Sequence, residues 1–391
     1  MTKLDSWKMG GAALLLCAAT AIAASAQTFT TLYTFTGGRD GGSPYGLLIA
    51  SGKLYGTAEF GGNQVGKCGI GCGTVWALSP QRRLLDVPFE LVEGANPQGG
   101  LITDGAGYAY GTAYRGGDKD AGTIFAVNQT GIIPLHSFGY QGDGGGPIGN
   151  LARDTSGNLY GATIGGGAYG SGTVFEVDGF GRQETILWSF TGKSDGGYPD
   201  AGLIIDDNNQ VYGTTELGGD QNCLPPNGCG TVFIANETGL GVLHTFTGSP
   251  DGAQPTAGLT FGRDGRVYGT TGFGGTDNLG TVFRIEDNGR DRVLYSFTGL
   301  SDGAEPFTSL IFDSSGSLYG GTAQGGAFGY GTIFKLSPSG IFTVLYTFTG
   351  GADGAIPTSL TLDSAGNLYG TALKGGDPLC LCGTVFKITR Q

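Results

Sequence analysis

The chain has 391 residues, of which 80 are glycine, and only 14% of its residues are charged. The glycines follow no three-residue period, which excludes collagen, and 11% aromatic residues are too many for a disordered chain. The net charge of −12 argues against a nucleic acid partner, because phosphate binding needs a basic surface. The composition favours short strands joined by many glycine-rich turns.

The first 26 residues have the pattern of a signal peptide. Two lysines precede an apolar run over 12–24, and Ala24-Ser25-Ala26 forms a small-x-small cleavage site. The run is short for a membrane span, so an N-terminal anchor helix is the weaker interpretation. Cys17 follows a leucine, which does not fit a bacterial lipobox. We therefore expect a soluble protein, secreted or periplasmic, whose mature chain begins at Gln27 and has no membrane span or C-terminal anchor.

Seven internal repeats follow, and they determine the expected fold. The clearest repeat begins at Leu345 and reads LYTFTGGADGAIPTSLTLDSAGNLYGTALKGG, then a short insert and GTVFKI. The second repeat is the most degenerate and lacks the Asp-Gly pair of the others. Equivalent repeats start at Leu32, Asp86, Leu135, Leu187, Leu243, Leu294 and Leu345.

Each repeat contains four short runs with the alternating pattern of strands, which we name a to d. Near the end of the chain they are 359–363 (a), 367–373 (b) and 383–388 (c), and the preceding strand d is 342–349. No segment keeps a helical period, because glycine interrupts every window of that length. Four antiparallel strands repeated seven times are typical of a β-propeller, and an open β-solenoid is the alternative.

The two ends of the repeat array complement each other. The last repeat stops after its strand c, 383–388, and has no strand d. The mature chain begins with an unmatched strand d over 28–36, TFTTLYTFT, which closely matches FTVLYTFT at 342–349. We therefore predict an all-β, seven-bladed β-propeller over 27–391, with four-stranded blades, in which the N-terminal strand closes the last blade.

The motifs LYxFTGxxDGxxP, LYGT, GG and GTVFK recur in this order through the chain. They resemble the GloVer tandem-repeat family of exported bacterial proteins, and the resemblance covers essentially the whole mature chain. It implies a propeller-type repeat domain, which is often joined to a surface anchor that we do not expect here. It implies no established reaction and no catalytic residues.

The d–a and b–c loops are expected on one face of the ring, because consecutive antiparallel strands alternate in direction. The a–b turns, such as Asp363-Ser-Ala-Gly-Asn, are short hairpins on the opposite face. Binding residues concentrate in long, variable loops on a rigid scaffold. We therefore expect the ligand on the face of the d–a and b–c loops, and we expect the d–a loops to lie near the channel mouth.

Two sets of side chains on this face are candidates for ligand binding. Asp-Gly pairs in six d–a loops offer carboxylates to a cation or a hydroxyl-rich ligand, or else they are turns in which the carboxylates accept local hydrogen bonds. These residues are Asp40, Asp143, Asp195, Asp251, Asp302 and Asp353. Side chains of the b–c loops either contact a sugar or a protein partner, or cover glycines at the base of the loops. They are Phe60, Tyr114, Arg115, Tyr169, Phe273, Phe328 and Tyr330.

Three cysteine pairs occupy the same place in three b–c loops. An even number of cysteines in an exported chain predicts disulfides, formed within each loop because the loops lie on different blades. A disulfide across one intervening residue is strained, and a metal site is the weaker alternative, since the spacings are irregular and no histidine is near. The pairs are Cys68/Cys72, Cys223/Cys229 and Cys380/Cys382.

Nothing in the sequence identifies a catalytic group. His136 and His244 share a strand-d column with aromatic residues of other repeats, so we interpret them as packing residues. Two G-x-S-x-G matches lack the strand-to-helix elbow of a nucleophile. We predict no metal site and no cofactor, and nothing supports Ca²⁺ at the loop carboxylates.

The expected function is a monomeric binding or scaffold module for extracellular carbohydrate or a protein partner. A polysaccharide hydrolase or lyase that uses carboxylates and tyrosines of the same face is the alternative, because propellers carry enzymes as well as binding modules.

Overall fold

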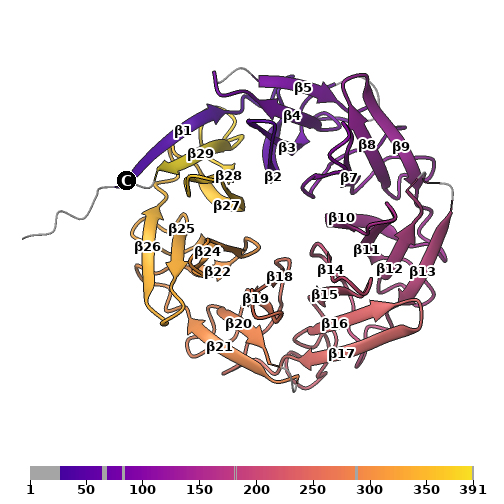
Figure 1. Ribbon diagram of the computed structural model, residues 1–391, viewed down its shortest axis with the longest axis vertical. Coiled ribbons are helices and arrows are strands. Elements are labelled where there is room, and N and C mark those ends of the chain that lie inside the picture. The colour runs from indigo at the N-terminus through magenta and orange to yellow at the C-terminus, as the bar shows by residue number, and fades with distance from the viewer. Residues whose placement is uncertain are drawn as a thin grey trace, which may run out of the picture.

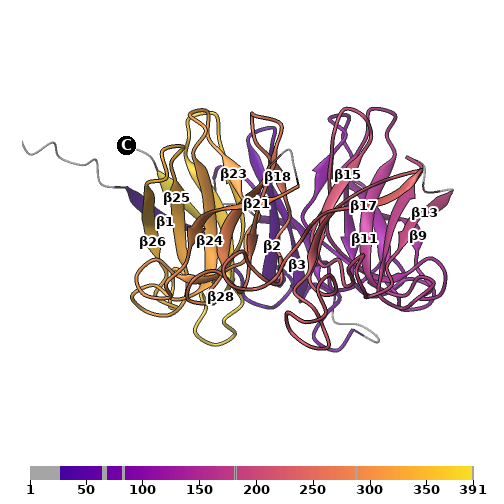
Figure 2. The ribbon, with the colours of Figure 1, turned by 90° about the horizontal axis from the view of Figure 1, so that it is seen from below.

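A computed structural model describes residues 27–63, 68–81, 84–179, 181, 183–286 and 289–389. These residues form strands and turns without a helix, so none of them belongs to a helix that could cross a membrane. Figure 1 shows seven sheets arranged as blades in a ring, and Figure 2 shows their strands running between the two faces of that ring. The predicted seven-bladed propeller is confirmed. The predicted signal peptide, 1–26, lies outside the described residues.

Blades 1 to 6 are antiparallel sheets whose strand order follows the chain from the centre outward, so each takes strands a to c from one repeat and strand d from the start of the next. Blade 1 contains β2 (Gly42–Ala50), β3 (Lys53–Phe60), β4 (Thr74–Leu78) and β5 (Leu84–Pro88). Blade 2 contains β6 (Ile102–Thr103), β7 (Ala109–Ala113), β8 (Thr123–Asn128) and β9 (Gly131–Ser137). Blade 3 contains β10 (Gly145–Arg153), β11 (Leu159–Gly165), β12 (Thr173–Val177) and β13 (Glu184–Ser189).

The next three blades repeat this pattern, and in blade 6 the innermost strand is split in two. Blade 4 contains β14 (Ile204–Ile205), β15 (Val211–Thr215), β16 (Thr231–Asn236) and β17 (Gly239–Thr245). Blade 5 contains β18 (Thr260–Phe261), β19 (Val267–Thr271), β20 (Thr281–Ile285) and β21 (Asp291–Ser296). Blade 6 contains β22 (Ala304–Pro306), β23 (Ile311–Phe312), β24 (Leu318–Gln324), β25 (Thr332–Leu336) and β26 (Phe342–Thr347).

Blade 7 is made from both ends of the chain, as predicted. Its strands are β27 (Ala355–Leu362), β28 (Leu368–Lys374), β29 (Thr384–Thr389) and, outermost, β1 (Thr28–Thr34). β1 pairs antiparallel with β29. The Phe29 ring stacks on Tyr346 of blade 6, with the ring centroids 3.8 Å apart. The ring of blades therefore closes through ladder hydrogen bonds and through the same kind of side-chain contact that joins other blades.

Aromatic pairs join every blade to the one before it. In blade 7, Phe386 of strand c meets Phe348 at the end of strand d of blade 6, with centroids 5.4 Å apart, and both rings are fully buried. The other six junctions repeat this contact at centroid separations from 4.9 to 5.7 Å. Burying two aromatic rings at each junction is the main apolar contribution to the ring.

The glycine of the Tyr-Gly-Thr motif makes room for these rings. A Cβ at Gly370 would lie 2.2 Å from Phe386 Cζ, and a Cβ at Gly161 would lie 2.4 Å from Phe175 Cζ. Neither glycine has a positive φ, so close packing of strand b on the aromatic ring, and not backbone conformation, requires glycine here.

In each of blades 2 to 7 the a–b turn is held by one aspartate carboxylate. In blade 6, Asp313 Oδ1 accepts hydrogen bonds from the amides of Ser315 and Ser317, and Tyr319 donates its hydroxyl to Asp313 Oδ2 at 3.0 Å. The same tyrosine-to-aspartate bond occurs in blades 2 to 5 and in blade 7. Burial by itself would raise the pKa of Asp313, but these donors outweigh it and hold the pKa far below its usual value.

We expect Phe29→Ala to lower the free energy of unfolding by roughly 1–3 kcal/mol, because it removes an aromatic stack and exposes the closing seam. Phe342→Ala is the matched control, since Phe342 stacks on Tyr295 at 3.9 Å in an uninterrupted part of the ring. Urea unfolding should give similar losses for the two variants. If Phe29→Ala keeps the urea midpoint of the wild type while Phe342→Ala lowers it, β1 does not close the ring.

We expect Asp313→Asn to destabilise the protein at neutral pH by about 1.5–3 kcal/mol, since hydrogen bonds to a charged group are lost. The folded-state pKa lies below the unfolded value of about 3.9, so this stabilisation is present above about pH 4 and is lost as the pH falls further. The difference between variant and wild type should therefore shrink on acidification, as measured by urea unfolding across the pH range. The exposed Asp277→Asn is the control; a difference that stays constant with pH would contradict this account.

Candidate functional site

The d–a and b–c loops share one face, as expected. Gly62 of a b–c loop donates its amide to the carbonyl of Gly38 in the adjoining d–a loop, and Ala95 and Arg115 exchange two backbone hydrogen bonds in the same way. These contacts hold each b–c loop against a d–a loop, so side chains of both loop types are available to a single ligand.

The six aspartates of the d–a loops lie in the turns that these loops make. Asp353 is representative: its carboxylate accepts hydrogen bonds from the amide and hydroxyl of Thr349, and from the hydroxyl of Tyr346 at 3.0 Å. Its carbonyl accepts a hydrogen bond from Thr384 in strand c of the next blade. Related local bonds are made by Asp40, Asp143, Asp195, Asp251 and Asp302.

These bonds correct the expected position of the six carboxylates. Each one contacts the end of an outermost strand, so it lies away from the channel mouth. The d–a loop begins at the outer edge with this turn, and only its later residues reach the centre. A ligand-binding role for the six aspartates stays a prediction.

The second repeat also has an acidic residue at this turn. Glu93 Oε2 accepts a hydrogen bond from the amide of Glu90 at 2.9 Å, and the carbonyl of Glu93 accepts one from the Thr123 hydroxyl. This loop is one residue shorter than the others, and the longer glutamate side chain spans the difference. In the sequence, the pair Glu93-Gly94 was the indication that this repeat also has an acidic residue at the turn.

The candidate side chains of the b–c loops fall into two groups. Tyr169, Phe328 and Tyr330 are exposed, with 66%, 59% and 47% of their surface accessible, and Arg115 is exposed as well. The half-buried ones are Phe60, Tyr114 and Phe273. The Phe60 ring covers Gly42, in agreement with the alternative that these side chains cover glycines, and Phe273 packs against the core between blades 4 and 5.

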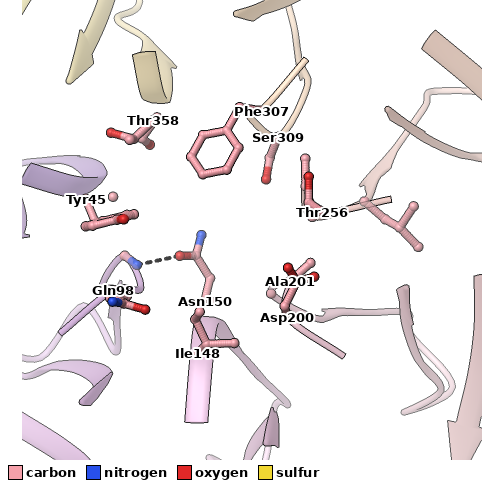
Figure 3. Close-up of a pocket in the computed structure, with 18 of the residues that line it drawn as sticks. Tyr45, Gln98, Ile148, Asn150, Asp200, Ala201, Thr256, Phe307, Ser309 and Thr358 are labelled. Atoms are coloured by element: carbon pink, nitrogen blue, oxygen red, sulfur yellow. Dashed lines mark hydrogen bonds between the residues drawn. The ribbon is translucent and has the colours of Figure 1, made fainter. Parts of the chain in front are cut away.

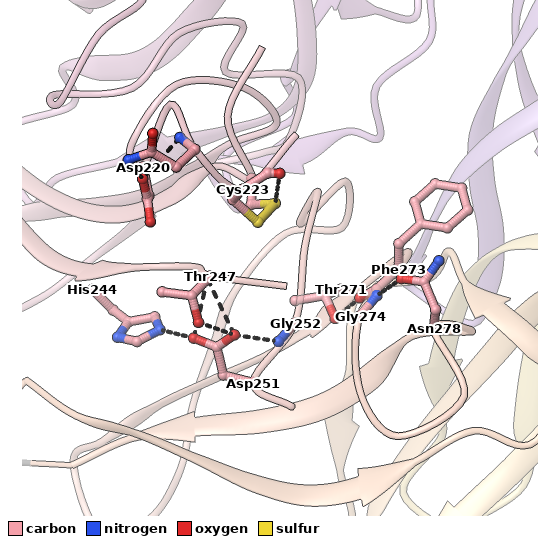
Figure 4. Close-up of a disulfide and its surroundings, with 12 residues drawn as sticks. Asp220, Cys223, His244, Thr247, Asp251, Gly252, Thr271, Phe273, Gly274 and Asn278 are labelled. Carbon is pink, nitrogen blue, oxygen red and sulfur yellow. Dashed lines mark hydrogen bonds and ion pairs between the residues drawn. A yellow bond between two sulfur atoms is a disulfide. The ribbon is translucent and has the colours of Figure 1, made fainter. Parts of the chain in front are cut away.

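All three cysteine pairs are disulfides within their own loops, including the pair across one residue. They are Cys68–Cys72, Cys223–Cys229 and Cys380–Cys382. Figure 4 shows the Cys223–Cys229 bridge close to the d–a loop that holds Asp251. The bridges constrain the b–c loops more than they hold the blades together, because each closes a very short loop.

A cavity of about 280 Å³ opens on the central axis of the propeller. One half-buried side chain per blade lines it, in each case the residue directly after the recurring proline of the d–a loop (Figure 3). The seven are Tyr45, Gln98, Ile148, Asp200, Thr256, Phe307 and Thr358. The repeats agree on the proline and differ on the next residue, so chemically different groups face one space.

Close contacts between the inner strands narrow the space below this ring of side chains. A Cβ on Gly46 would lie 2.1 Å from the Cα of Gly100, so these two backbones touch without side chains between them. Asn150, which also lines the cavity, accepts a hydrogen bond from the amide of Gly100 through Oδ1 at 2.6 Å. Because Gly100 and Asn150 come from blades 2 and 3, this bond links neighbouring blades at the wall of the cavity.

Asp200 has the most unusual electrostatics in the cavity wall. Burial, together with the charge of Glu216, raises its pKa well above the ordinary value of an aspartate. Its Oδ1 is buried and has no hydrogen-bond partner among the described residues. A ligand hydroxyl or a protonated carboxyl would satisfy this atom.

A second hollow of about 750 Å³ adjoins the cavity on the loop face between blades 1 and 2. Tyr114 and Arg115 line it, as do Asp118, Lys119 and Asp120. Gln98 belongs to the walls of both spaces, and its Nε2 donates to Glu59 Oε1 at 2.8 Å. Gln98 therefore lies between the central cavity and the hollow that Tyr114 and Arg115 line.

The sequence did not reveal the ring of post-proline residues, because a repeat motif is recognised from the positions that its copies share, and this position varies. The available indication was a single variable position beside a proline that all seven repeats share. Its members reach the axis because the proline lies within the innermost strand of blades 1, 3, 6 and 7, and shortly before that strand in blades 2, 4 and 5.

Comparison of structures supports the fold. The chain resembles a catalytically inactive variant of virginiamycin B lyase from Staphylococcus aureus, solved with quinupristin, at 14% identity and a TM-score of 0.60 over 93% of this chain and 100% of that chain. It also resembles the extracellular domain of a protein described as a one component system from B. thetaiotaomicron, at 12% identity and a TM-score of 0.58 over 93% of this chain and 40% of that one.

No curated protein matches the sequence. The Gloeobacter/Verrucomicrobia repeat matches it over residues 18–225, 127–312 and 224–391, in agreement with the motifs that recur along the chain. Together these matches span all seven blades, and the chain belongs to the Gloeobacter/Verrucomicrobia repeat family.

Proposed function

We propose that this protein is an exported binding module that holds a carbohydrate at the loop-face mouth of its central cavity. The observation that carries the proposal is the ring of seven post-proline side chains, of six residue types, around one space. A structural spacer would have no need for such variety, whereas recognition of an asymmetric ligand requires different groups at defined positions.

The side chains around the cavity suit a sugar. Tyr45 and Phe307 supply aromatic surfaces that can lie against the C–H face of a pyranose ring. Gln98, Asn150 and Asp200 supply amide and carboxyl groups, which bind hydroxyls both as donors and as acceptors. A few polar groups placed among apolar walls are typical of small-molecule sites.

The size of the two spaces suggests how much of a glycan would be held. The central cavity, about 280 Å³, is near the lower end of the range for ligand pockets, so it suits one or two sugar units. The hollow beside Gln98 is larger, and Tyr114 and Arg115 line it. We infer that further units of a chain would lie there.

Export is supported by two observations. Three disulfides are typical of proteins that fold in an oxidising compartment. In addition, one of the similar structures is an extracellular domain, which is in keeping with an extracellular site for this chain as well.

A second candidate function is a polysaccharide hydrolase or lyase, and Asp200 is the observation that favours it. A carboxyl with a raised pKa in a cavity wall can act as a general acid. The two functions differ in turnover: a binding module leaves the glycan intact, and an enzyme shortens it.

A glycan array with residues 27–391, followed by titration of the best glycan, tests the proposal. We expect Tyr45→Ala and Phe307→Ala each to weaken binding about tenfold or more, equivalent to about 1.4 kcal/mol, because an aromatic contact is lost. Phe328→Ala is the matched control, as an exposed phenylalanine of a b–c loop outside the cavity, and should change affinity less than twofold.

Three results would contradict the proposed binding at the cavity. They are an absence of glycan binding, a loss confined to Phe328→Ala, and release of new reducing or unsaturated ends from the bound glycan. If turnover is observed and Asp200→Asn abolishes it while affinity is kept, the enzymatic alternative replaces the binding module.

A further inference from the structure

Polar clusters occur at two of the outer junctions between blades. His136, Asp143 and Glu184 form one, and His244, Asp251 and Asp291 form the other, each with a possible ligand atom from every member within 4.8 Å of those of the other two. All six side chains are half-buried. Both clusters have the same construction: a histidine of strand d, the aspartate of the following d–a turn, and an acidic residue at the start of strand d in the next blade.

At the other junctions both the histidine and the facing acidic residue of the next blade are replaced, so the two positions change together. The histidine position is Tyr295 in blade 5 and Tyr346 in blade 6, and these rings stack on Phe342 and Phe29 of the next blade. Trp188 of blade 3 packs in one cluster with Leu240 of blade 4.

The remaining two junctions pair Val87 with Ile132 and Tyr33 with Leu84 in shared apolar clusters. Among the described residues at the start of strand d, the acidic ones are therefore Glu184 and Asp291, the two that face a histidine of the preceding blade. Strand-d alignment by itself predicts packing roles for both histidines, and the facing carboxylate becomes visible only when neighbouring blades are brought together.

The atoms lie at separations expected for ligands of one ion. His244 Nε2 is 3.2 Å from Asp251 Oδ2 and 3.8 Å from Asp291 Oδ1, and His136 Nε2 is 3.5 Å from Glu184 Oε2. Ligands bound tetrahedrally to zinc at about 2.0–2.1 Å are separated from one another by roughly 3.3 Å. Figure 4 shows the His244 ring directed at the Asp251 carboxylate.

Packing holds each imidazole in this orientation. The ring of His136 lies edge-on to Phe138 at a centroid distance of 4.7 Å, and that of His244 to Phe246 at 4.8 Å. Both phenylalanines are fully buried members of the blade junctions. The Nε2 atoms are thus presented to the carboxylates by the rigid part of the propeller, where the tyrosines of other blades place their hydroxyls.

Several of these atoms lack a partner. His136 Nε2, Glu184 Oε1 and Asp291 Oδ2 are buried and make no hydrogen bond within the described part of the chain. No lysine or arginine of that part forms an ion pair with any of the six side chains. Burial raises the pKa of Glu184 to about 8 and lowers the pKa of His136, so burial disfavours the charged form of each group. A bound divalent cation would compensate both carboxylates and use the free imidazole nitrogen.

We propose that each cluster binds one divalent transition-metal ion, of which Zn²⁺ is the best match. One imidazole nitrogen and two carboxylate oxygens are ligands that zinc accepts, with a fourth position left for water. Ca²⁺ is a poor match, because it prefers six to eight oxygen ligands. Each ion would join the outer strands of two blades, β9 to β13 and β17 to β21.

The test is titration of ZnCl₂ into untagged, metal-free protein covering 27–391, by calorimetry and without reductant, so that the cysteines stay paired. We expect about two Zn²⁺ per chain, about one for His136→Tyr or His244→Tyr, and none for the double variant. Tyrosine is the residue that other repeats carry at this position, so these variants should fold. CaCl₂ in place of ZnCl₂ should give no binding. Zinc should also raise the melting temperature of the wild type and leave that of the double variant unchanged.

Tyr295→His is the matched control, since it creates a histidine beside Asp302 but opposite Phe342, without the second carboxylate from the next blade. It should keep a stoichiometry of two. An absence of Zn²⁺ binding by the wild type would overturn the proposal. Equal binding by the wild type and the double variant would overturn it too, because the ions would then lie elsewhere, and so would a third ion bound by Tyr295→His.

Discussion

Each blade of this propeller is completed by an aromatic side chain from the blade before it. Phe348 meets Phe386, Phe138 meets Phe175, and equivalent pairs occupy all seven junctions. A blade by itself would leave these rings in water, so the array is stable only when it closes on itself. This requirement accounts for the position of β1, which gives the last blade its outer strand and supplies Phe35 to the first junction.

The aromatic junctions leave the centre of the ring free to vary. The strands, the glycines beneath the rings and the aspartate turns hold the backbone in a similar way in most repeats, so the fold does not require one residue type after the proline. Tyr45, Asp200 and Phe307 can then differ in chemistry without a cost to the fold. The variable position lies where seven blades converge, and so single substitutions in separate repeats together change one binding surface.

The sequence predicted the blades, their number, the closure and the three disulfides, because each depends on motifs that lie within one repeat or at its two ends. It failed where a feature depends on contacts between repeats. Asp353 was expected near the channel, yet its turn with Thr349 and Tyr346 holds it at the outer edge. Gln98 and Asp200 were missed, since a column of dissimilar residues has no motif.

The outer rim of the junctions is a second place where repeats can diverge, under a different constraint. At the axis one side chain can change alone, whereas at the rim a side chain of one blade touches a side chain of the next, so both must change. Tyr346 with Phe29 and His244 with Asp291 are two solutions of that pairing, one apolar and one polar. The polar solution places two carboxylates and an imidazole away from water, which is unfavourable unless a cation or a proton is shared among them. Whatever occupies these junctions therefore acts on the contact between blades, and so on the closure of the whole ring.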